Sequence, residues 1–327
     1  MMQAWISGEA PGIENLQIAN QSKPIPGNNE LLVWVTHAAL NFSDLLMIDE
    51  QYQVRPPRPF IPGQEIAGIV EQAPTGSKFS IGDKITSKIL WGGFAQFAVV
   101  RDDMAIAVSP EIDLAAAVAL PVSYVTALVA LDHCSQTGVG KTVLVHAAAG
   151  GVGLACIEVA VARGATVIAT AGATGRVKLA IDRGASHGVN YREDDWFKQV
   201  KSLTNGRGAD IIVDPVGGQI GEDSLRCIAM DGTLLIVGFS SGKMPKLAAN
   251  RLLLKRASAK GVYWNHDTDF AILNQVNADL SELLSAGKIN PQLSATYQFD
   301  DLPKALDDLA NRRVMGKVAL HLREPRN

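Results

Sequence analysis

The segment VLVHAAAGGVGLACIEVAVARGA, residues 143–165, determines the fold class of this chain. A β-branched apolar run leads into a turn of small residues, AAGGVG (148–153), and apolar residues then follow at helical spacing. A strand, a glycine-rich turn and a helix in this order bind dinucleotides, because the backbone approaches the pyrophosphate and the helix N-terminus faces the anion. Ala148 occupies the first glycine position of the usual G-x-G-x-x-G fingerprint. We predict that a nucleotide is bound by Gly150, Gly151, Val152 and Gly153; the alternative is a glycine-rich packing turn.

The next strand indicates which dinucleotide is bound. Sites for NAD place Asp or Glu about 20 residues after the turn, where the carboxylate holds the ribose 2′-hydroxyl. Here the strand ends VIATAGATGR (167–176), and no carboxylate follows before Asp182. A guanidinium attracts a 2′-phosphate and binds it through two parallel hydrogen bonds. The sequence therefore predicts NADPH, with Gly172 and Arg176 at its phosphate, unless Arg176 lies only on a solvated helix face.

Composition limits the classes of partner. The chain has 327 residues, of which 47% are hydrophobic and 19% charged, and its net charge is −3. Because no basic tract stands out, nucleic acid is not an expected partner. The three cysteines, at positions 134, 156 and 227, are odd in number and far apart, which argues against a disulfide framework. They suit a reducing compartment, and we expect a cytoplasmic protein.

One apolar segment, LAAAVALPVSYVTALVAL (114–131), approaches the length of a membrane span. It consists largely of alanine and carries Pro121 in its middle. We expect a buried helix of the core and no association with a membrane. The N-terminus, MMQAWISGEAPG, lacks a basic start followed by an apolar run, so no signal peptide is expected.

The pattern of elements changes once along the chain. Residues 1 to about 112 read as all-β, with short alternating runs between Pro- and Gly-rich turns, as in a small barrel or sandwich. From about residue 113 to residue 264 strands and helices alternate, which predicts a doubly wound parallel sheet of the α/β class. Expected helices include 153–164, 176–184 and 223–232, and the sixth strand is expected at 257–264. The tail, 265–327, departs from this pattern, and we expect it to return to the first domain and complete it.

Several spaced motifs extend over essentially the whole chain. They are ALNFSDLL (39–46), YQVRPPRPFIPGQEIAGIV (52–70), LPVSYVTA (120–127), VLVHAAAGGVG (143–153), DPVGG (214–218), LLIVGFSSG (234–242), NRLLLK (250–255) and GKVAL (316–320). In this order they resemble the zinc-free quinone oxidoreductase branch of the medium-chain dehydrogenase/reductase family. The resemblance implies a GroES-like β-barrel catalytic domain, 1–118 completed by 265–327, joined to a Rossmann NADPH-binding domain, 119–264.

The resemblance also bears on metal binding. Zinc-dependent alcohol dehydrogenases of the same family hold their catalytic zinc through a cysteine and a histidine, and those places correspond here to Asn41 and Gln64. Neither amide is a usual zinc ligand, since zinc prefers thiolate, imidazole and carboxylate. We therefore expect no metal, and a zinc-type alcohol dehydrogenase is disfavoured.

The chemistry expected without a metal is hydride transfer to acceptors that delocalise the incoming charge. Quinones and α,β-unsaturated carbonyls do so by conjugation, so positioning supplies much of the catalysis. The resemblance implies that Asn41 and Tyr52 border the cleft beside the nicotinamide. Tyr52 would hydrogen-bond the acceptor oxygen or relay a proton, and Asn41 would orient the cofactor or the substrate. The alternative for Tyr52 is a packing role in a Pro-rich loop.

The resemblance assigns further residues to the cofactor. Around the nicotinamide and its ribose it places Thr126, Gly238, Phe239 and Ser240, and Tyr191 flanks the adenosine phosphate. Lys317 would line the cofactor cleft from the tail, or would be a surface lysine before an edge strand. Relatives pair the sixth strand across a two-fold axis, so a homodimer through this edge is expected. The alternative function is that of an NADPH-binding, crystallin-like protein with little turnover.

Overall fold

The computed structural model describes residues 1–322, which form two compact units. The first unit joins residues 1–122 to the C-terminal segment from residue 291, and the second unit is residues 123–290. The expected boundaries lay at 118/119 and 264/265. The first expected boundary lies a few residues before the observed one at 122/123. The second is observed at 290/291, because residues 265–290 pack with the second unit.

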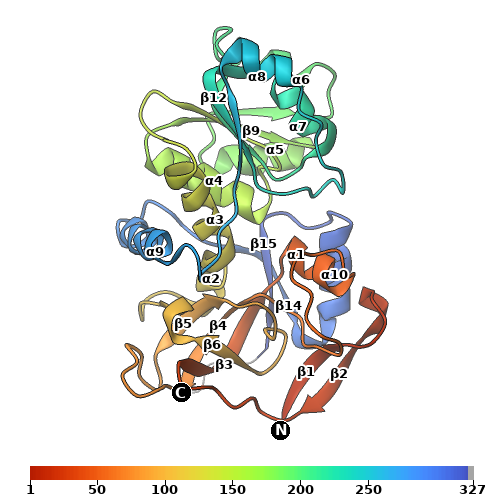
Figure 1. The fold of residues 1–327 in the computed structure, drawn as a ribbon, viewed down its shortest axis with the longest axis vertical. Helices are drawn as coiled ribbons and strands as arrows, with labels where there is room; N and C mark the ends of the chain where they lie inside the picture. Colours follow the sequence, from red (N-terminus) through yellow and green to blue (C-terminus); the bar gives the residue numbers. More distant parts are fainter. Residues whose placement is uncertain (323–327) are drawn as a thin grey trace. The chain divides into compact units, whose positions relative to one another are not determined.

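A sheet completed by the C-terminal segment forms the first unit (Figure 1). Its order is β14-β15-β3-β4-β5-β7, with β6 paired to β3 and a separate hairpin of β1 and β2. The bounds are β1 Met2–Ser7, β2 Leu16–Gln21, β3 Glu30–Ala39, β4 Glu65–Gln72, β5 Lys84–Lys88, β6 Phe97–Arg101, β7 Ile106–Ala107, β14 Leu293–Gln298 and β15 Lys317–His321. Strand β15 lies between β14 and β3, so the tail returns to the first unit as expected.

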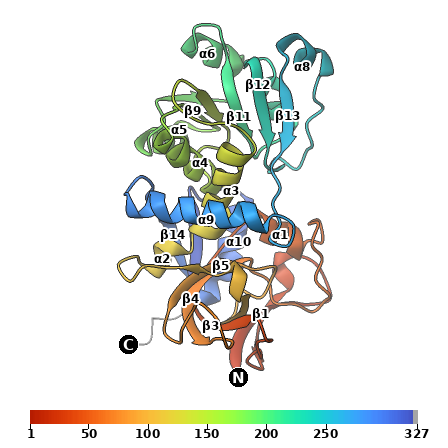
Figure 2. The same ribbon diagram turned by 60° about the vertical axis from the view of Figure 1, so that its left-hand side comes forward.

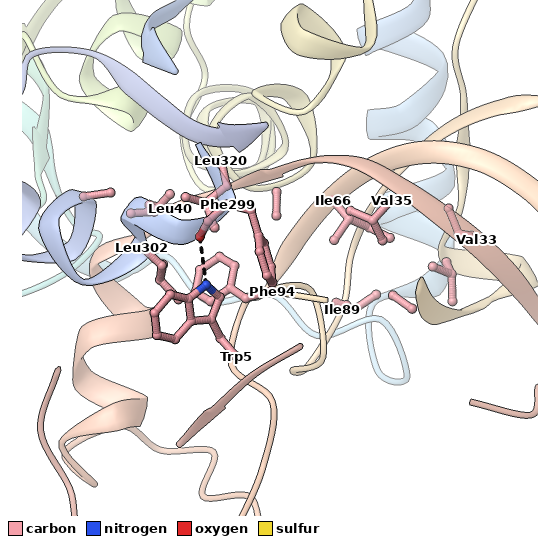
Figure 3. Close-up of a cluster of buried hydrophobic side chains, with 14 of the residues drawn as sticks. Trp5, Val33, Val35, Leu40, Ile66, Ile89, Phe94, Phe299, Leu302 and Leu320 are labelled. Carbon is pink, nitrogen blue, oxygen red and sulfur yellow. Dashed lines mark hydrogen bonds between the residues drawn. The ribbon is translucent and has the colours of Figure 1, made fainter. Parts of the chain in front are cut away.

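The core of this unit contains side chains from both ends of the chain (Figure 3). The indole Nε1 of Trp5 donates a hydrogen bond of 2.8 Å to the carbonyl oxygen of Phe299, which precedes helix α10 (Leu302–Ala310). Leu302 and Leu320 are fully buried in the same cluster. Burying a Leu or Phe side chain contributes ~1.5–3 kcal/mol, so the unit depends on its C-terminal segment.

Helix α1 (Phe42–Ile48) corrects the all-β expectation for the N-terminal part of this unit. Helix α1 begins after Asn41, and the Asp44 carboxylate accepts a hydrogen bond of 2.7 Å from the backbone N–H of Asn41. Such a bond satisfies a donor at the helix start and favours a helix there. Leu45 and Ile48 then fall on one face and are buried in the core.

A six-stranded parallel sheet forms the second unit, in the order β10-β9-β8-β11-β12-β13. The strands are β8 Thr142–Val145, β9 Thr166–Ala171, β10 His187–Asn190, β11 Ala209–Asp214, β12 Ile228–Ile236 and β13 Ser258–Gly261. Figure 2 shows β11, β12 and β13 side by side. The strand order reverses between β8 and β11, and in open parallel sheets ligands bind at the carboxyl ends of the strands beside such a reversal.

Most predicted helices of this unit are present. They are α4 Gly151–Ala162, α5 Thr174–Asp182, α6 Trp196–Leu203, α7 Gly218–Ser224 and α8 Ala249–Lys255. The helix expected at 223–232 is wrong, because α7 ends at Ser224 and β12 begins at Ile228. The backbone N–H of Ala209 donates to the carbonyl of Cys227, and Asp231 has a φ of 58°, which a right-handed helix excludes.

Helix α9 (Phe270–Ser285) explains the shifted domain boundary. It packs against α3 (Val125–Leu128), and its Asp279 forms an ion pair of 3.3 Å with Arg163, just after α4. Its apolar face buries Leu273 and Leu280. The helix therefore belongs to the second unit and not to the returning tail.

The apolar segment Leu114–His133 is helical, as expected. It begins with α2 (Leu114–Ala117) and includes wide turns around Pro121, which has no N–H to donate to the preceding turn. Its length and hydropathy would suffice to cross a membrane, but 83% of its apolar window is buried inside the protein. Such burial is typical of a core helix.

Candidate functional site

The glycine-rich turn connects β8 to the start of α4. Gly150 is the N-cap, and its N–H donates a hydrogen bond of 2.8 Å to the carbonyl of Ala147, which has a φ of 45°. A Cβ at position 153 would lie 2.5 Å from that carbonyl oxygen, so only glycine lets α4 begin this close to the strand. The first N–H groups of a helix have no intrahelical acceptor and carry partial positive charge. At Gly151 and Val152 the turn is partly exposed, which suits an anion.

A buried histidine, His146, follows β8 directly and links it to β9 and α7. His146 Nδ1 lies 2.6 Å from Thr170 Oγ1 of β9, and its Nε2 lies 2.8 Å from Ser224 Oγ of α7. The Ser224 hydroxyl donates to the carbonyl of Ile220, so it accepts from the Nε2–H of His146. Burial lowers the pKa of His146 to about 4, and the ring is therefore neutral at physiological pH. Sequence reasoning gave this residue no role, because a lone histidine carries no pattern.

At the ends of β9 and β10, Gly172 lies against two side chains. A Cβ on Gly172 would lie 3.0 Å from Arg192 Nε and 3.2 Å from Tyr191 Cε2. The predicted residues Gly172 and Tyr191 are therefore brought together. Arg192 was not predicted; its only sequence signal is its place directly after Tyr191 at the end of a strand. It adds an exposed guanidinium beside the glycine that the sequence assigned to the phosphate.

Arg176 lies in the first turn of α5, directly after β9. The residue is half-buried. The stretch between β9 and α5 carries no carboxylate, as the sequence indicated. Its expected contact with a 2′-phosphate stays a prediction.

The loops after β11 and β12 are hydrogen-bonded to each other. The N–H groups of Gly238 and Ser240 donate to the carbonyls of Asp214 (3.4 Å) and Pro215 (3.0 Å). Gly217 has a φ of 70°, and a Cβ there would lie 2.9 Å from Phe239 Cδ1. The predicted group at 238–240 is thus held at the carboxyl end of the sheet.

Thr126 lies in α3 of the same unit and is buried. Its Oγ1 accepts a hydrogen bond of 3.1 Å from the indole Nε1 of Trp264, in the segment that follows β13. The structure therefore joins Thr126 to the end of the sixth-strand segment, and its expected contact with the nicotinamide ribose stays a prediction.

The first unit contains a buried polar cluster of Asn41, Glu65 and Lys317. Lys317 Nζ lies 2.5 Å from Glu65 Oε2 and 2.6 Å from Asn41 Oδ1. The Asn41 Nδ2 group donates a hydrogen bond of 3.0 Å to Glu65 Oε2. Only 6% of Lys317 is exposed, and β15 is not an edge strand, so the alternative of a surface lysine is wrong. Glu65 was not predicted, although it directly follows Gln64.

Asp44 adds a second buried carboxyl group to this cluster. Its Oδ2 accepts from Asn41 N–H, and its Oδ1 has no hydrogen-bond partner within residues 1–322. Burial raises the pKa of Asp44 to about 7; Lys317 opposes this rise, and the charge of Glu65 adds to it. Burial also lowers the pKa of Lys88, which lies opposite Glu65 on β5, while Glu65 opposes that shift.

The residues at the positions that bind zinc in relatives do not fit a zinc site. Asn41 is engaged by an ammonium, and Gln64 is buried with its Oε1 lacking a partner in the described chain. Among residues 1–322, no three His, Cys, Asp or Glu side chains form a group that could hold a metal ion. Neither an amide nor an ammonium group is a favourable zinc ligand.

Tyr52 lies in the loop between α1 and β4. It is half-buried, and its carbonyl oxygen accepts a hydrogen bond of 3.5 Å from Arg55 Nε. The structure brings Asn41 and Lys317 together, and the expected place of Tyr52 beside Asn41 stays a prediction. Both expected roles of Tyr52, chemical and packing, stay predictions.

Comparison with known proteins agrees with the fold. The chain matches the alcohol dehydrogenase GroES-like domain over residues 27–110 and the zinc-binding dehydrogenase family over residues 151–279. It is 36% identical over 305 residues to quinone oxidoreductase-like protein 2 of Rattus norvegicus, covering 92% of this chain and 87% of the relative. The chain therefore belongs to the medium-chain dehydrogenase/reductase family, which confirms the resemblance and the predicted fold class.

Other relatives carry a related name. The quinone oxidoreductase of Sus scrofa is 29% identical over 317 residues, which cover 95% of this chain and 94% of the relative. Among solved structures, a probable oxidoreductase of Mycobacterium abscessus superposes with a TM-score of 0.89 at 34% identity, covering 98% of this chain and 99% of that one. Escherichia coli quinone oxidoreductase, solved in complex with NADPH, gives 0.89 at 26% identity with the same coverage.

Proposed function

We propose that this oxidoreductase transfers a hydride from NADPH to quinones or α,β-unsaturated carbonyls and needs no metal. Membership of the family and the names of its relatives support an oxidoreductase of the quinone oxidoreductase type. The observation that carries the proposal is the carboxyl edge of the parallel sheet. There the glycine-rich turn leads into the N-terminus of α4. Arg192 flanks Gly172, and no carboxylate stands where NAD sites hold the ribose 2′-hydroxyl.

The second unit supplies the groups for the cofactor. The N–H groups at the start of α4 would bind the pyrophosphate, and Arg176 and Arg192 would neutralise the 2′-phosphate. Tyr191 would flank the adenosine phosphate beside Gly172. Thr126, Gly238, Phe239 and Ser240 would hold the nicotinamide and its ribose. The E. coli relative solved with NADPH supports the choice of this cofactor.

The reaction is a two-electron reduction. When bound, NADPH supplies a hydride from its nicotinamide ring and leaves NADP⁺. A quinone gains that hydride and a proton and becomes a hydroquinone. An enone gains the hydride at its β-carbon, and the resulting enolate gains a proton, finally at its α-carbon, to become a saturated carbonyl. In this proposal Asn41 hydrogen-bonds the acceptor oxygen, and the Tyr52 hydroxyl donates or relays the proton.

The absence of a metal in this proposal rests on the side chains available. Asn41, Gln64 and Lys317 occupy the region that would have to bind zinc, and none is a favourable ligand. A conjugated acceptor distributes the incoming negative charge itself, so hydrogen bonds from the protein suffice to stabilise it. Simple alcohols lack such conjugation and are expected to be poor substrates.

The proposal is tested by the oxidation of NADPH, followed by nicotinamide absorbance, with 1,4-benzoquinone, 2-alkenals and enones. We expect turnover with at least one conjugated class, a preference for NADPH over NADH, and none with primary alcohols and NADP⁺. Binding of NADPH without turnover across all classes would instead favour the crystallin-like alternative. Zinc-dependent alcohol oxidation would overturn the proposal.

We also propose a homodimer that pairs through β13. This strand ends the six-stranded sheet, and all four of its residues are exposed. An unpaired strand edge offers backbone groups to a second copy. Sedimentation at micromolar concentration should give twice the mass of the chain. We also propose that the protein is cytoplasmic.

A further inference from the structure

The side-chain amide of Asn41 lies between two groups of opposite hydrogen-bonding character. Its Oδ1 faces the Lys317 ammonium at 2.6 Å, and its Nδ2 faces the Glu65 carboxylate at 3.0 Å. We propose that Lys317 and Glu65 are positioning residues that fix the Asn41 amide in one orientation. Asn41 then presents an N–H, and never its carbonyl oxygen, to the bound molecule. This inference rests on the proposed function and specifies which substrate group the site accepts.

The orientation follows from the chemistry of the two neighbours. A lysine ammonium only donates hydrogen bonds, and an ionised carboxylate only accepts them. Turning the amide over would place Oδ1 against the carboxylate of Glu65 and the NH₂ group against the ammonium of Lys317. Both charge-assisted hydrogen bonds would be lost. Such a loss is costly in a site where Glu65 is fully buried and Lys317 is 6% exposed.

The two positioning residues are themselves held by the fold. Glu65 Oε1 accepts a hydrogen bond of 2.7 Å from the backbone N–H of Val122, which leaves Oε2 for the cluster. Lys317 begins β15, which pairs with β3, and Glu65 begins β4, which pairs with the other edge of β3. The backbone N–H of Asn41 is bonded to Asp44. Each partner of the amide therefore comes from a fixed element.

One hydrogen of the Asn41 NH₂ group remains for a ligand. The amide donates one bond to Glu65, and residues 1–322 provide no acceptor for its second N–H. The residue is 9% exposed, so a small part of its surface can be reached. A fixed donor suits the carbonyl oxygen of a quinone or enone, on which negative charge develops during reduction. This N–H does not suit a ligand group that can only donate a hydrogen bond.

The decisive variant removes both charges together: Lys317→Met with Glu65→Gln. Both substitutions keep the approximate shape and remove an ammonium and its carboxylate partner together, so the protein should fold. The amide is then free to turn over. We expect kcat with 1,4-benzoquinone to fall about tenfold, while the dissociation constant for NADPH, measured by nicotinamide fluorescence, stays within about twofold of the wild-type value. A wild-type kcat in this folded variant would overturn the inference.

Two controls identify Asn41 as the residue through which the pair acts. The matched pair Lys23→Met with Glu71→Gln removes a Lys–Glu ion pair of 2.6 Å in the same unit, outside the cluster, and should leave kcat unchanged. In an Asn41→Leu background, the Lys317→Met and Glu65→Gln changes should produce no further fall in kcat. A further tenfold fall in that background would show that the pair acts elsewhere.

A measurement without turnover separates this inference from the proposed function. The Asn41 side-chain signal in a nitrogen–proton correlation spectrum is assigned by its absence in Asn41→Leu. We expect its protons to exchange slowly with solvent in the wild type and at least tenfold faster in the double variant. Equal exchange in both proteins would overturn the inference. Slow exchange in a wild type that turns over no quinone or enone would contradict only the proposed function.

Discussion

Lys317 and Asn41 lie 276 residues apart in the chain, yet their side-chain atoms Nζ and Oδ1 are 2.6 Å apart. This contact exists because the C-terminal strand β15 inserts between β14 and β3. The polar cluster of the first unit therefore depends on both ends of the chain. The same two ends meet in the apolar core through Trp5 and Phe299 (Figure 3).

The single substitution Lys317→Met should destabilise the protein more than the double change that also includes Glu65→Gln. Alone, it leaves the fully buried Glu65 carboxylate without its counter-ion. Breaking a buried pair in this way costs about 3–5 kcal/mol, whereas replacing both partners is close to neutral. Urea unfolding monitored by circular dichroism measures the difference. Equal loss in the two variants would contradict the importance of this pair.

The substitution Gly153→Ala should weaken NADPH binding at least about tenfold and lower the unfolding free energy by ~1–3 kcal/mol. The added methyl group would lie 2.5 Å from the Ala147 carbonyl oxygen, so the turn or α4 must shift. Gly138→Ala is the control, because its Cβ would meet no atom within 4 Å. Fluorescence titration and thermal unfolding test both effects, and an unchanged affinity would argue against a pyrophosphate at this turn.

Arg192→Ala should reduce the affinity for NADPH about tenfold and leave the affinity for NADH nearly unchanged, since only NADPH carries the 2′-phosphate. The prediction rests on the position of Arg192 Nε beside Gly172. Arg176→Ala should act in the same direction. Lys178→Ala, which removes an exposed ion pair with Asp182, is the control. Equal losses for both cofactors would place these arginines away from the phosphate.

Asp44→Asn should stabilise the protein at neutral and alkaline pH. The folded state raises the pKa of Asp44 from 3.8 to about 7 and so binds its proton more tightly than the unfolded state does. The stability of the wild type therefore falls as the pH rises between these values, by up to ~4 kcal/mol. Asparagine does not titrate and can still accept from Asn41 N–H. The stability difference should grow from about pH 4 to pH 7, and a flat difference would contradict the shift.

His146→Gln should flatten the loss of stability in acid. The folded state lowers the pKa of His146 from 6.5 to about 4, so the unfolded state binds the proton more tightly. Wild-type stability should fall as the pH drops between these two values, by up to ~3 kcal/mol. Glutamine can contact Thr170 or Ser224 without titrating. Unfolding free energies measured across this pH range give the test, and parallel curves for both proteins would contradict it.

Local patterns allowed the sheet of the second unit to be predicted. The turn at 148–153 carries its strand, glycines and helix in one continuous stretch, and the structure has β8, Gly150 and α4 in that order. The helix expected at 223–232 failed because the apolar residues Cys227 and Ile228 suit a buried strand as well as a buried helix. Their partner, Ala209, lies on a different strand.

The polar cluster was predicted only in part. Asn41 and Lys317 were identified from motifs, but no sequence pattern indicates that they contact each other. Glu65 and Asp44 were missed because charged residues are usually exposed, and their burial depends on strands that are distant in sequence. Arg192 was missed for a related reason: an arginine after a strand is usually a solvated residue.

The two units have different relationships to the order in which a ribosome makes the chain. Residues 123–290 form one continuous stretch, so the second unit can assemble as soon as that stretch has emerged. The first unit must wait, since β15 follows the whole of the second unit in the sequence. Until Lys317 arrives, the nascent protein holds the Glu65 carboxylate without its ammonium partner. A nucleotide-binding half can thus exist during translation before the half that would receive the substrate.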